Sequence, residues 1–378
     1  MTSAEVDAAS LVRKECRMHR MMLPILLNVT ILFVLDAQAA CPPFYADKMN
    51  LMVYTDVNGI VHPVKTAEDW QKRREHILSN IQLVMGPLPD VSNKVPLDMR
   101  IVEEVKLAKV KRRKIMFATE RADRAPAYLL IPDNHKSRLP AVLCLHQTTR
   151  IGKAEPAGVG GNRNLHYALE LAEKGYVTLA PDYPNFGEYE FDPYEHRYAS
   201  ATMKGIWNHM RAIDLLQSLP YVDPERIGSI GHSLGGHNTL FVAVFDTRIK
   251  AMVSSCGFNS FFKYYSGDLT GWSHRGYMPR IASAYGKDPA KMPFDFTEII
   301  GALAPRPLFI NAPLKDRNFE VSGVFDCVKA AGPVYGLLGA KGNLAPVHPD
   351  VGHEFPPAVR QAAYAFLDKA LRPETSIR

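Results

Sequence analysis

The chain has 378 residues, of which 47% are hydrophobic and 22% charged, and its formal net charge is +6. This length and hydrophobic content predict one large packed domain with an N-terminal extension and exclude disorder over the bulk of the chain. Part of the positive charge is a basic cluster within the first twenty residues, and no basic stripe with interleaved aromatic residues follows it. We therefore expect no nucleic-acid partner.

Residues 1–39 have the order of a secretory signal peptide. Basic residues precede an apolar run over residues 23–35, which is too short to span a bilayer comfortably, and Ala37-Gln38-Ala39 follows. An uncleaved N-terminal anchor is one alternative, and lipid attachment at Cys41 is another. We expect a secreted or periplasmic protein with no stable membrane partner once the segment is removed. Three later cysteines are expected to be buried thiols: Cys144, Cys256 and Cys327.

Residues 40–104 are expected to form an N-terminal extension built around one amphipathic helix. Thr66 and Asp69 have the spacing of a capping box, with Asp in place of Glu, and apolar residues at helical spacing continue to Val84. Gly86 and the prolines that follow it end the helix. Because a single amphipathic helix is marginal in water, we expect its apolar face to pack on the next domain.

Residues 105–378 are expected to form an α/β domain, because short apolar strands alternate with helical stretches. Residues 114–118 and 127–131 predict an antiparallel pair, and the continuous apolar stretch at 140–145 is typical of a strand covered on both faces. The predicted fold class is α/β, a doubly wound, mainly parallel sheet with helices on both faces. Further strands are expected at 176–180, 226–230, 249–254, 307–310 and 334–338, and helices at 165–174, 203–219, 322–331 and 357–371.

The segment around Ser233 predicts an abrupt turn from a strand into a helix. Gly231-His232-Ser233-Leu234-Gly235 fits the pattern G-x-S-x-G, the nucleophile elbow of α/β-hydrolases. Such a turn holds the serine in a strained backbone conformation, and side chains two positions to either side of it would collide. We therefore expect Ser233 to be a nucleophile at the apex of this turn.

The partners of Ser233 are expected after it in the chain, the acid first and the histidine last. His353 lies in the loop before the final helix, beside a glycine that permits a tight turn, and is preferred to His348. Asp316 follows the penultimate strand directly, whereas Asp326 falls within the next helix. We expect His353 to be the general base and Asp316 to hold its tautomer.

Two backbone N–H groups are expected to form an oxyanion hole. One belongs to Leu234, at the start of the helix, where the helix dipole also favours negative charge. The other is expected in the loop after the strand at 140–145, with Gln147 as the donor. This loop has no His-Gly-Gly-Gly run, which distinguishes it from lipase-type esterases.

Five short stretches together carry a resemblance to a known family: His146-Gln147, 182–187, 231–236, 316–319 and 352–356. With them, residues 140–371 and 70–89 resemble the bacterial dienelactone hydrolase and acetyl xylan esterase branch of the α/β-hydrolase superfamily. There is some likeness to the catalytic domain of prolyl-oligopeptidase-type peptidases. Dienelactone hydrolases proper use a cysteine nucleophile, whereas this chain has Ser233.

Two insertions, at 183–198 and 258–296, combine aromatic rings with carboxylates, which suits a sugar surface as well as ordinary loop packing. Arg275 and Arg280 are alternative partners for an acidic sugar. No metal is expected, because His232 and His237 do not align on one helical face, and no cofactor, because a dinucleotide fingerprint is absent. The residues expected to bind substrate are Phe186, Trp272 and Tyr277.

The sequence thus predicts a secreted serine carboxylic-ester hydrolase that works through an acyl-enzyme and deacylates a carbohydrate or other small ester. A serine peptidase is one alternative, but the region before residue 105 is too short for the propeller that usually screens peptidase substrates. A non-catalytic carbohydrate-binding protein is the other, and the intact order of serine, acid and histidine argues against it. The sequence does not indicate the natural ester or the oligomeric state.

Overall fold

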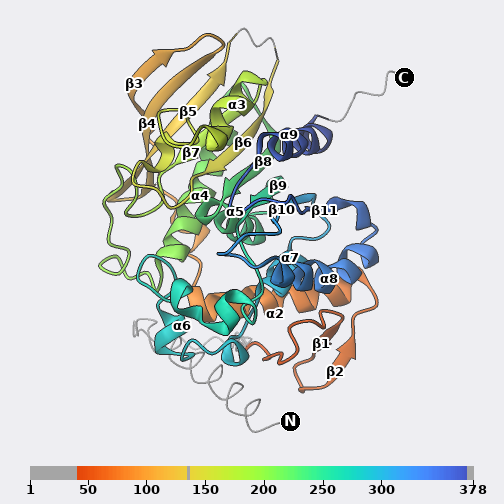
Figure 1. The fold of residues 1–378 in the computed structure, drawn as a ribbon. Helices are drawn as coiled ribbons and strands as arrows, with labels where there is room; N and C mark the ends of the chain where they lie inside the picture. Colours follow the sequence, from red (N-terminus) through yellow and green to blue (C-terminus); the bar gives the residue numbers. More distant parts are fainter. Residues whose placement is uncertain (1–40, 134–136, 373–378) are drawn as a thin grey trace.

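The computed structural model describes residues 41–133 and 137–372, so the expected signal segment at 1–39 lies outside the described residues. In the part described, nine strands form one mixed sheet in the order β11-β10-β9-β8-β6-β7-β5-β4-β3 (Figure 1). The strands are β3 (Arg100–Lys106), β4 (Val110–Glu120), β5 (Asp123–Pro132), β6 (Leu139–Leu145), β7 (Val177–Pro181), β8 (Val222–His232), β9 (Ile249–Ser255), β10 (Leu308–Asn311) and β11 (Leu344–Val347).

Six of these strands, from β11 to β7, run parallel, and β5, β4 and β3 continue the sheet, each antiparallel to the strand before it in this order. The mainly parallel α/β-hydrolase fold predicted from the sequence is therefore confirmed. The predicted antiparallel pair is confirmed as β4 and β5.

Helices cover both faces of the sheet, and β6 shows why its sequence is apolar throughout. Its residues Ala141, Leu143 and Leu145 belong to the larger core, and the alternate residues Val142 and Cys144 to the core on the other face. The larger core includes residues of α2 (Ala67–Met85), α4 (Ala201–Ser218), α5 (Leu234–Phe245), α7 (Phe296–Ala302) and α8 (Val321–Leu337), and the other includes residues of α3 (Tyr167–Glu173) and α9 (Pro357–Leu371).

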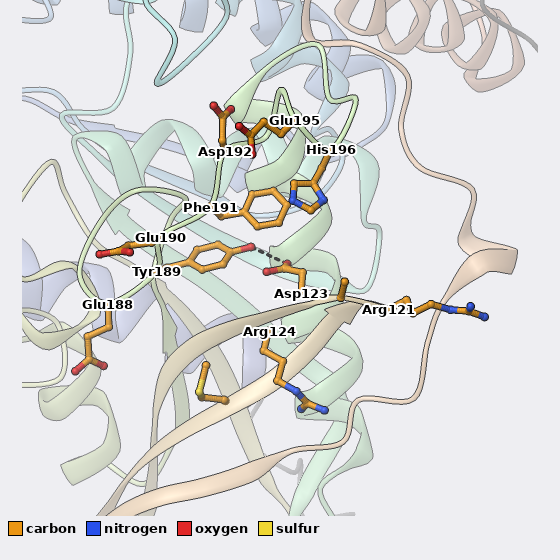
Figure 2. A pocket seen from close by; sticks show the side chains of 12 residues that line it. Arg121, Asp123, Arg124, Glu188, Tyr189, Glu190, Phe191, Asp192, Glu195 and His196 are labelled. Atoms are coloured by element: carbon orange, nitrogen blue, oxygen red, sulfur yellow. Dashed lines mark hydrogen bonds between the residues drawn. The ribbon is translucent and has the colours of Figure 1, made fainter.

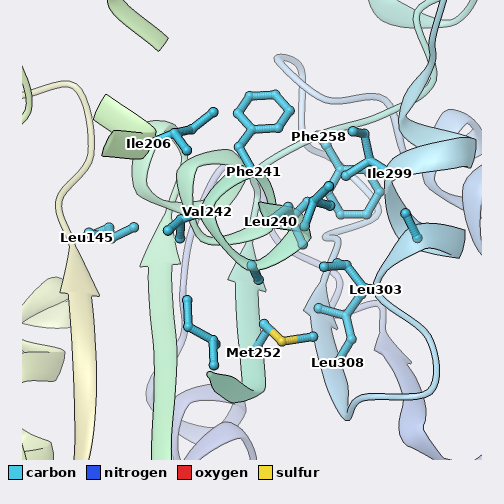
Figure 3. Close-up of a cluster of buried hydrophobic side chains, with 14 of the residues drawn as sticks. Leu145, Ile206, Leu240, Phe241, Val242, Met252, Phe258, Ile299, Leu303 and Leu308 are labelled. Atoms are coloured by element: carbon cyan, nitrogen blue, oxygen red, sulfur yellow. The ribbon is translucent and has the colours of Figure 1, made fainter. Parts of the chain in front are cut away.

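Helix α5 lies at the centre of the larger core. Figure 3 shows Leu240 and Val242 of this helix among Leu145, Met252 and Leu308, which come from three different strands. Burying large apolar side chains on both sides of the sheet is the main stabilising contribution in such a fold. The same packing fixes where α5 begins, and Ser233 immediately precedes it.

One predicted strand is wrong. Residues 334–338 are the end of α8, which continues to Leu337, and the edge strand β11 comes later. The apolar run at this point follows the helical period, since Ala330, Ala331 and Val334 are buried on one side. Pro333 is exposed and is tolerated within the helix.

The N-terminal extension contains a two-stranded hairpin, β1 (Val53–Thr55) and β2 (Val61–Pro63), and helix α2. As predicted, Thr66 caps α2, accepting the N–H of Asp69, and Gly86 ends it with a φ of 93°. Strand β3 crosses the expected domain boundary at 104–105, so that boundary cuts through the sheet. Among the described residues, no helix is long and apolar enough to cross a membrane.

A buried ion pair fixes α2 to the α/β domain. Arg73 of α2 lies 2.5 Å from Glu298 of α7, and both side chains are fully buried. The other carboxylate oxygen of Glu298 accepts the N–H of Asp295, completing a capping box at the start of α7. Lys48 is buried nearby, and burial lowers its pKa to about 8.

We expect Glu298→Gln to destabilise the protein by about 3 to 5 kcal/mol, because it removes the carboxylate that pairs with the buried cation Arg73 and lowers the negative charge near buried Lys48. Urea unfolding of the purified variant measures this loss. Glu75→Gln, on the exposed side of α2, is the control and should change stability by less than about 0.5 kcal/mol. A cost for Glu298→Gln as small as that of the control would show that the pair does not anchor α2.

Candidate active site

Ser233 occupies the sharp turn between β8 and α5. Its φ of 54° and ψ of −118° are strained for a residue with a side chain. A Cβ on Gly231 would lie 2.1 Å from the carbonyl oxygen of Gly235, so the two glycines four positions apart leave no room for a side chain. The predicted backbone geometry of the elbow is confirmed.

The start of α5 lies directly against the end of β6. A Cβ on Gly235 would lie 1.8 Å from the carbonyl oxygen of Leu145. This contact places the loop that begins at His146 beside the first turn of α5, whose first N–H groups have no partner within the helix. Leu234 and Gln147 are thus brought to the same corner of the sheet. The Gln147 side chain is held by Glu155, its Nε2 lying 2.9 Å from Oε2.

His353 and Asp316 are hydrogen-bonded to each other. Nδ1 of His353 lies 2.9 Å from Oδ2 and 3.1 Å from Oδ1 of Asp316. The same carboxylate accepts the backbone N–H groups of Asn318 and Phe319. Burial alone would raise the pKa of Asp316, but the hydrogen bond from His353 and these backbone bonds outweigh it, so the pKa lies below its usual value.

The two histidines of the loop have different hydrogen-bond partners. An ionised carboxylate can only accept, so Nδ1 of His353 carries the proton and Nε2 is left to accept one. His348 instead pairs with the carbonyl oxygen of Ala312. The ring of His353 lies 4.9 Å from that of His232, the residue next to Ser233. The structure therefore brings Asp316, His353 and the elbow to one edge of the sheet.

Two of the three residues expected to bind substrate border the elbow. Phe186 and Tyr277 are both partly exposed and pack in one cluster with Leu234. The Tyr277 hydroxyl also lies 3.4 Å from the hydroxyl of Thr148, in the loop after β6. Trp272 is only 2% exposed and packs against Tyr277, so the structure assigns its indole to the core. The prediction that Trp272 offers a sugar-stacking face is therefore wrong.

A separate open cleft of about 660 Å³ lies between the β4–β5 turn and the insertion that follows β7 (Figure 2). At its base Tyr189 donates a hydrogen bond to Asp123, and the ring of Phe191 stacks on His196 at 4.3 Å. Its rim is rich in carboxylates. Asp192 on this rim pairs with Arg275 at 2.9 Å, so Arg275 is already neutralised by a protein carboxylate.

Among the described residues, one group brings three possible metal-ligand atoms within 4.8 Å of one another: Cys256, Asp316 and His353. Asp316 and His353 are already bonded to each other, and burial raises the pKa of the Cys256 thiol well above its usual value. This cysteine, like Cys144 and Cys327, is a free buried thiol, as the sequence predicted.

Sequence reasoning did not single out two polar residues beside this site, Ser255 and Asn311. Both end apolar strands, β9 and β10, and both are buried. The available signal was a polar residue at the end of a largely apolar strand, at the carboxyl edge where parallel α/β sheets place their sites.

Together, the doubly wound sheet, the serine elbow and the paired histidine and carboxylate define an α/β-hydrolase of the serine esterase class. The family described as "Glucuronyl esterase, fungi" matches residues 127–339, more than half of the chain. The chain belongs to this glucuronyl esterase family, and it is a serine ester hydrolase.

Individual relatives agree with this assignment. YtaP of Bacillus subtilis, described as a hydrolase, is 30% identical over 66% of this chain and 84% of its own length. The 4-O-methyl-glucuronoyl methylesterase of Phanerochaete carnosa is 27% identical, and the match covers 48% of this chain and 49% of that enzyme. The solved glucuronoyl esterase from Solibacter usitatus has the same fold, with a TM-score of 0.65 over 86% of this chain and 98% of that one, at 18% identity.

We expect Gly235→Ala to destabilise the protein by about 1 to 3 kcal/mol or more, because the new methyl group meets a backbone carbonyl that cannot move without shifting β6. Thermal unfolding measures the change. Gly336→Ala, in α8, is the matched control: no atom lies within 4 Å of its added Cβ, so it should raise stability by about 0.5 to 1 kcal/mol. A Gly235→Ala variant as stable as the parent would contradict the close packing.

Proposed function

We propose that Ser233, His353 and Asp316 form the catalytic triad of this esterase. Oγ of Ser233 attacks the ester carbon while its proton passes to Nε2 of His353. The N–H groups of Leu234 and Gln147 stabilise the resulting oxyanion. His353 then gives the proton to the departing alcohol, which leaves an acyl-enzyme.

Water completes the turnover by the reverse sequence. His353 removes a proton from the water as its oxygen attacks the acyl carbon, and then returns the proton to Oγ as the carboxylic acid leaves. Throughout, ionised Asp316 stabilises the imidazolium form of His353. The observation that carries this proposal is the 2.9 Å bond between Nδ1 of His353 and Asp316, with the ring of His353 4.9 Å from that of His232 in the elbow.

We further propose that the substrate is an ester of a carbohydrate, and in the first place an ester formed by the carboxyl group of a uronic acid. The family match and the relatives named for glucuronoyl esters support this choice over an acetylated sugar. The esterase reading is also favoured over a peptidase. The family match and the methylesterase relatives support this choice too.

We expect the parent enzyme to hydrolyse methyl and benzyl glucuronate faster than acetylated xylan, with p-nitrophenyl acetate as a general ester control. Ser233→Ala should lower kcat on every ester by about 10⁵-fold or more while leaving thermal unfolding unchanged. Fluorophosphonate labelling of the parent, and none of the variant, provides a second readout. Retained hydrolysis by purified Ser233→Ala protein would refute the triad. A preference for acetyl esters would refute only the choice of substrate.

We also propose that the protein is exported from the cytoplasm. Export is supported by the basic, apolar and small-residue order of residues 1–39, and a polysaccharide ester would lie outside the cell. We expect expression of the full chain to yield protein outside the inner membrane whose N-terminus lies near residue 40, as measured by cell fractionation and mass spectrometry. Full-length protein retained in the cytoplasm would contradict this.

A further inference from the structure

Three neighbouring parallel strands end in a row of buried polar residues. In the strand register, His232 of β8 lies beside Ser255 of β9, and Ser255 lies beside Asn311 of β10. Residues in register on adjacent strands have side chains on the same face of the sheet. None of the three is more than 2% exposed. Because burying a polar group without a hydrogen bond is costly, the partners of this row show what it stabilises.

Asn311 binds the loop that carries His353. Its Nδ2 donates to the carbonyl oxygen of Glu354, at 2.9 Å, and to Oγ of Ser255, at 2.8 Å. An amide nitrogen has two protons, so these bonds use both. The side-chain oxygen of Asn311 has no partner among the described residues, and Nδ2 also lies 3.8 Å from Sγ of Cys256, so the contacts of the nitrogen set the amide's orientation. Since Glu354 follows His353 directly, Asn311 fixes the backbone next to the histidine.

Ser255 binds the elbow in two ways. Its backbone oxygen accepts the N–H of Ser233, at 2.8 Å. Its Oγ accepts from Asn311, and its hydroxyl proton is thus available for Nδ1 of His232, at 2.9 Å. Burial lowers the pKa of His232 to about 3, so this ring is neutral and can accept. The two bonds donated by Asn311 therefore connect the loop of His353 to Ser255. The bonds of Ser255 to the N–H of Ser233 and to Nδ1 of His232 then connect it to the elbow.

Proton transfer between Ser233 and His353 needs two separate alignments. The bond to Asp316 sets the tautomer and the ring orientation of His353, but Asp316 belongs to the loop after β10, and its hydrogen bonds go to His353 and to the backbone of its own loop. The row across β8, β9 and β10 supplies the second alignment, the position of the His353 loop relative to Ser233. We propose that Asn311 and Ser255 are positioning residues that hold these two segments in register for catalysis. This inference rests on the triad proposed above.

The test compares Asn311→Ala and Ser255→Ala with the parent on methyl glucuronate or p-nitrophenyl acetate. Misplacing a catalytic group by about 1 Å can cost about 10²-fold, so we expect kcat to fall by about 10- to 100-fold while KM stays within about twofold. The rate of fluorophosphonate labelling should fall with kcat, because it needs the same contact between serine and histidine. Ser255→Thr keeps the hydroxyl and should recover most of the lost kcat.

Ser229→Ala is the matched control. Ser229 is a buried residue of β8 whose Oγ lies 3.2 Å from the hydroxyl of Thr239, away from the His353 loop. Its kcat should stay within about twofold of the parent even where its melting temperature falls as much as that of Ser255→Ala. If Asn311→Ala does not fold, the smaller change Ser255→Ala decides the question. Unchanged kcat in a folded Ser255→Ala, or an equal loss of kcat in Ser229→Ala, would overturn the inference. An inactive parent would instead refute the proposed triad.

Discussion

The contact between the backbone of Gly235 and the carbonyl oxygen of Leu145 is the constraint on which the candidate site depends. It allows α5 to begin directly over the end of β6, and this close approach leaves no room for a Cβ. The turn that feeds the helix is then so sharp that Ser233 takes a positive φ, a strain that costs on the order of 1 to 3 kcal/mol. The burial of α5 in the larger core offsets that cost, because most of the helix is inaccessible to solvent. Strain at the serine and packing of the helix are two consequences of one geometry.

The electrostatic design of the site follows from burial. Burial lowers the pKa of both His232 and His237 to about 3 and raises that of the Cys256 thiol, so these three neighbours are neutral near pH 7. Asp316 is buried as well, yet it stays ionised because it accepts hydrogen bonds from His353 and from the backbone. His353 therefore faces one carboxylate and no competing cation from these neighbours. This arrangement suits a base that must gain and release a proton within one turnover.

The sequence predicted the structure best where a local backbone or packing requirement limits which residue types can occur. The elbow glycines, the cap at Thr66 and the apolar strands could be predicted because each depends on near neighbours in the chain. The end of α8 could not, since Val334 and its apolar neighbours fit a strand as well as a helix until the core they face is known. The prediction for Trp272 failed for a similar reason. An aromatic residue in a long insertion has the same appearance in sequence whether its ring faces solvent or other rings. Only the strand register could show that Ser255 and Asn311 share a row with His232.

The N-terminal extension is a structural part of the catalytic body, and a chain of contacts shows how far its influence reaches. Arg73 of α2 binds Glu298, which caps α7 together with Asp295. A side-chain oxygen of Asp295 also accepts the backbone N–H of Phe261, in the insertion after β9. Phe261 packs on Trp272, and Trp272 on Tyr277, which borders the elbow. Because these contacts lead from α2 to the insertion after β9, losing the ion pair of Arg73 and Glu298 should disturb the aromatic residues beside Ser233 before it disturbs the sheet. In this fold the helix that precedes the catalytic domain is thus linked by contacts to the aromatic residues beside Ser233.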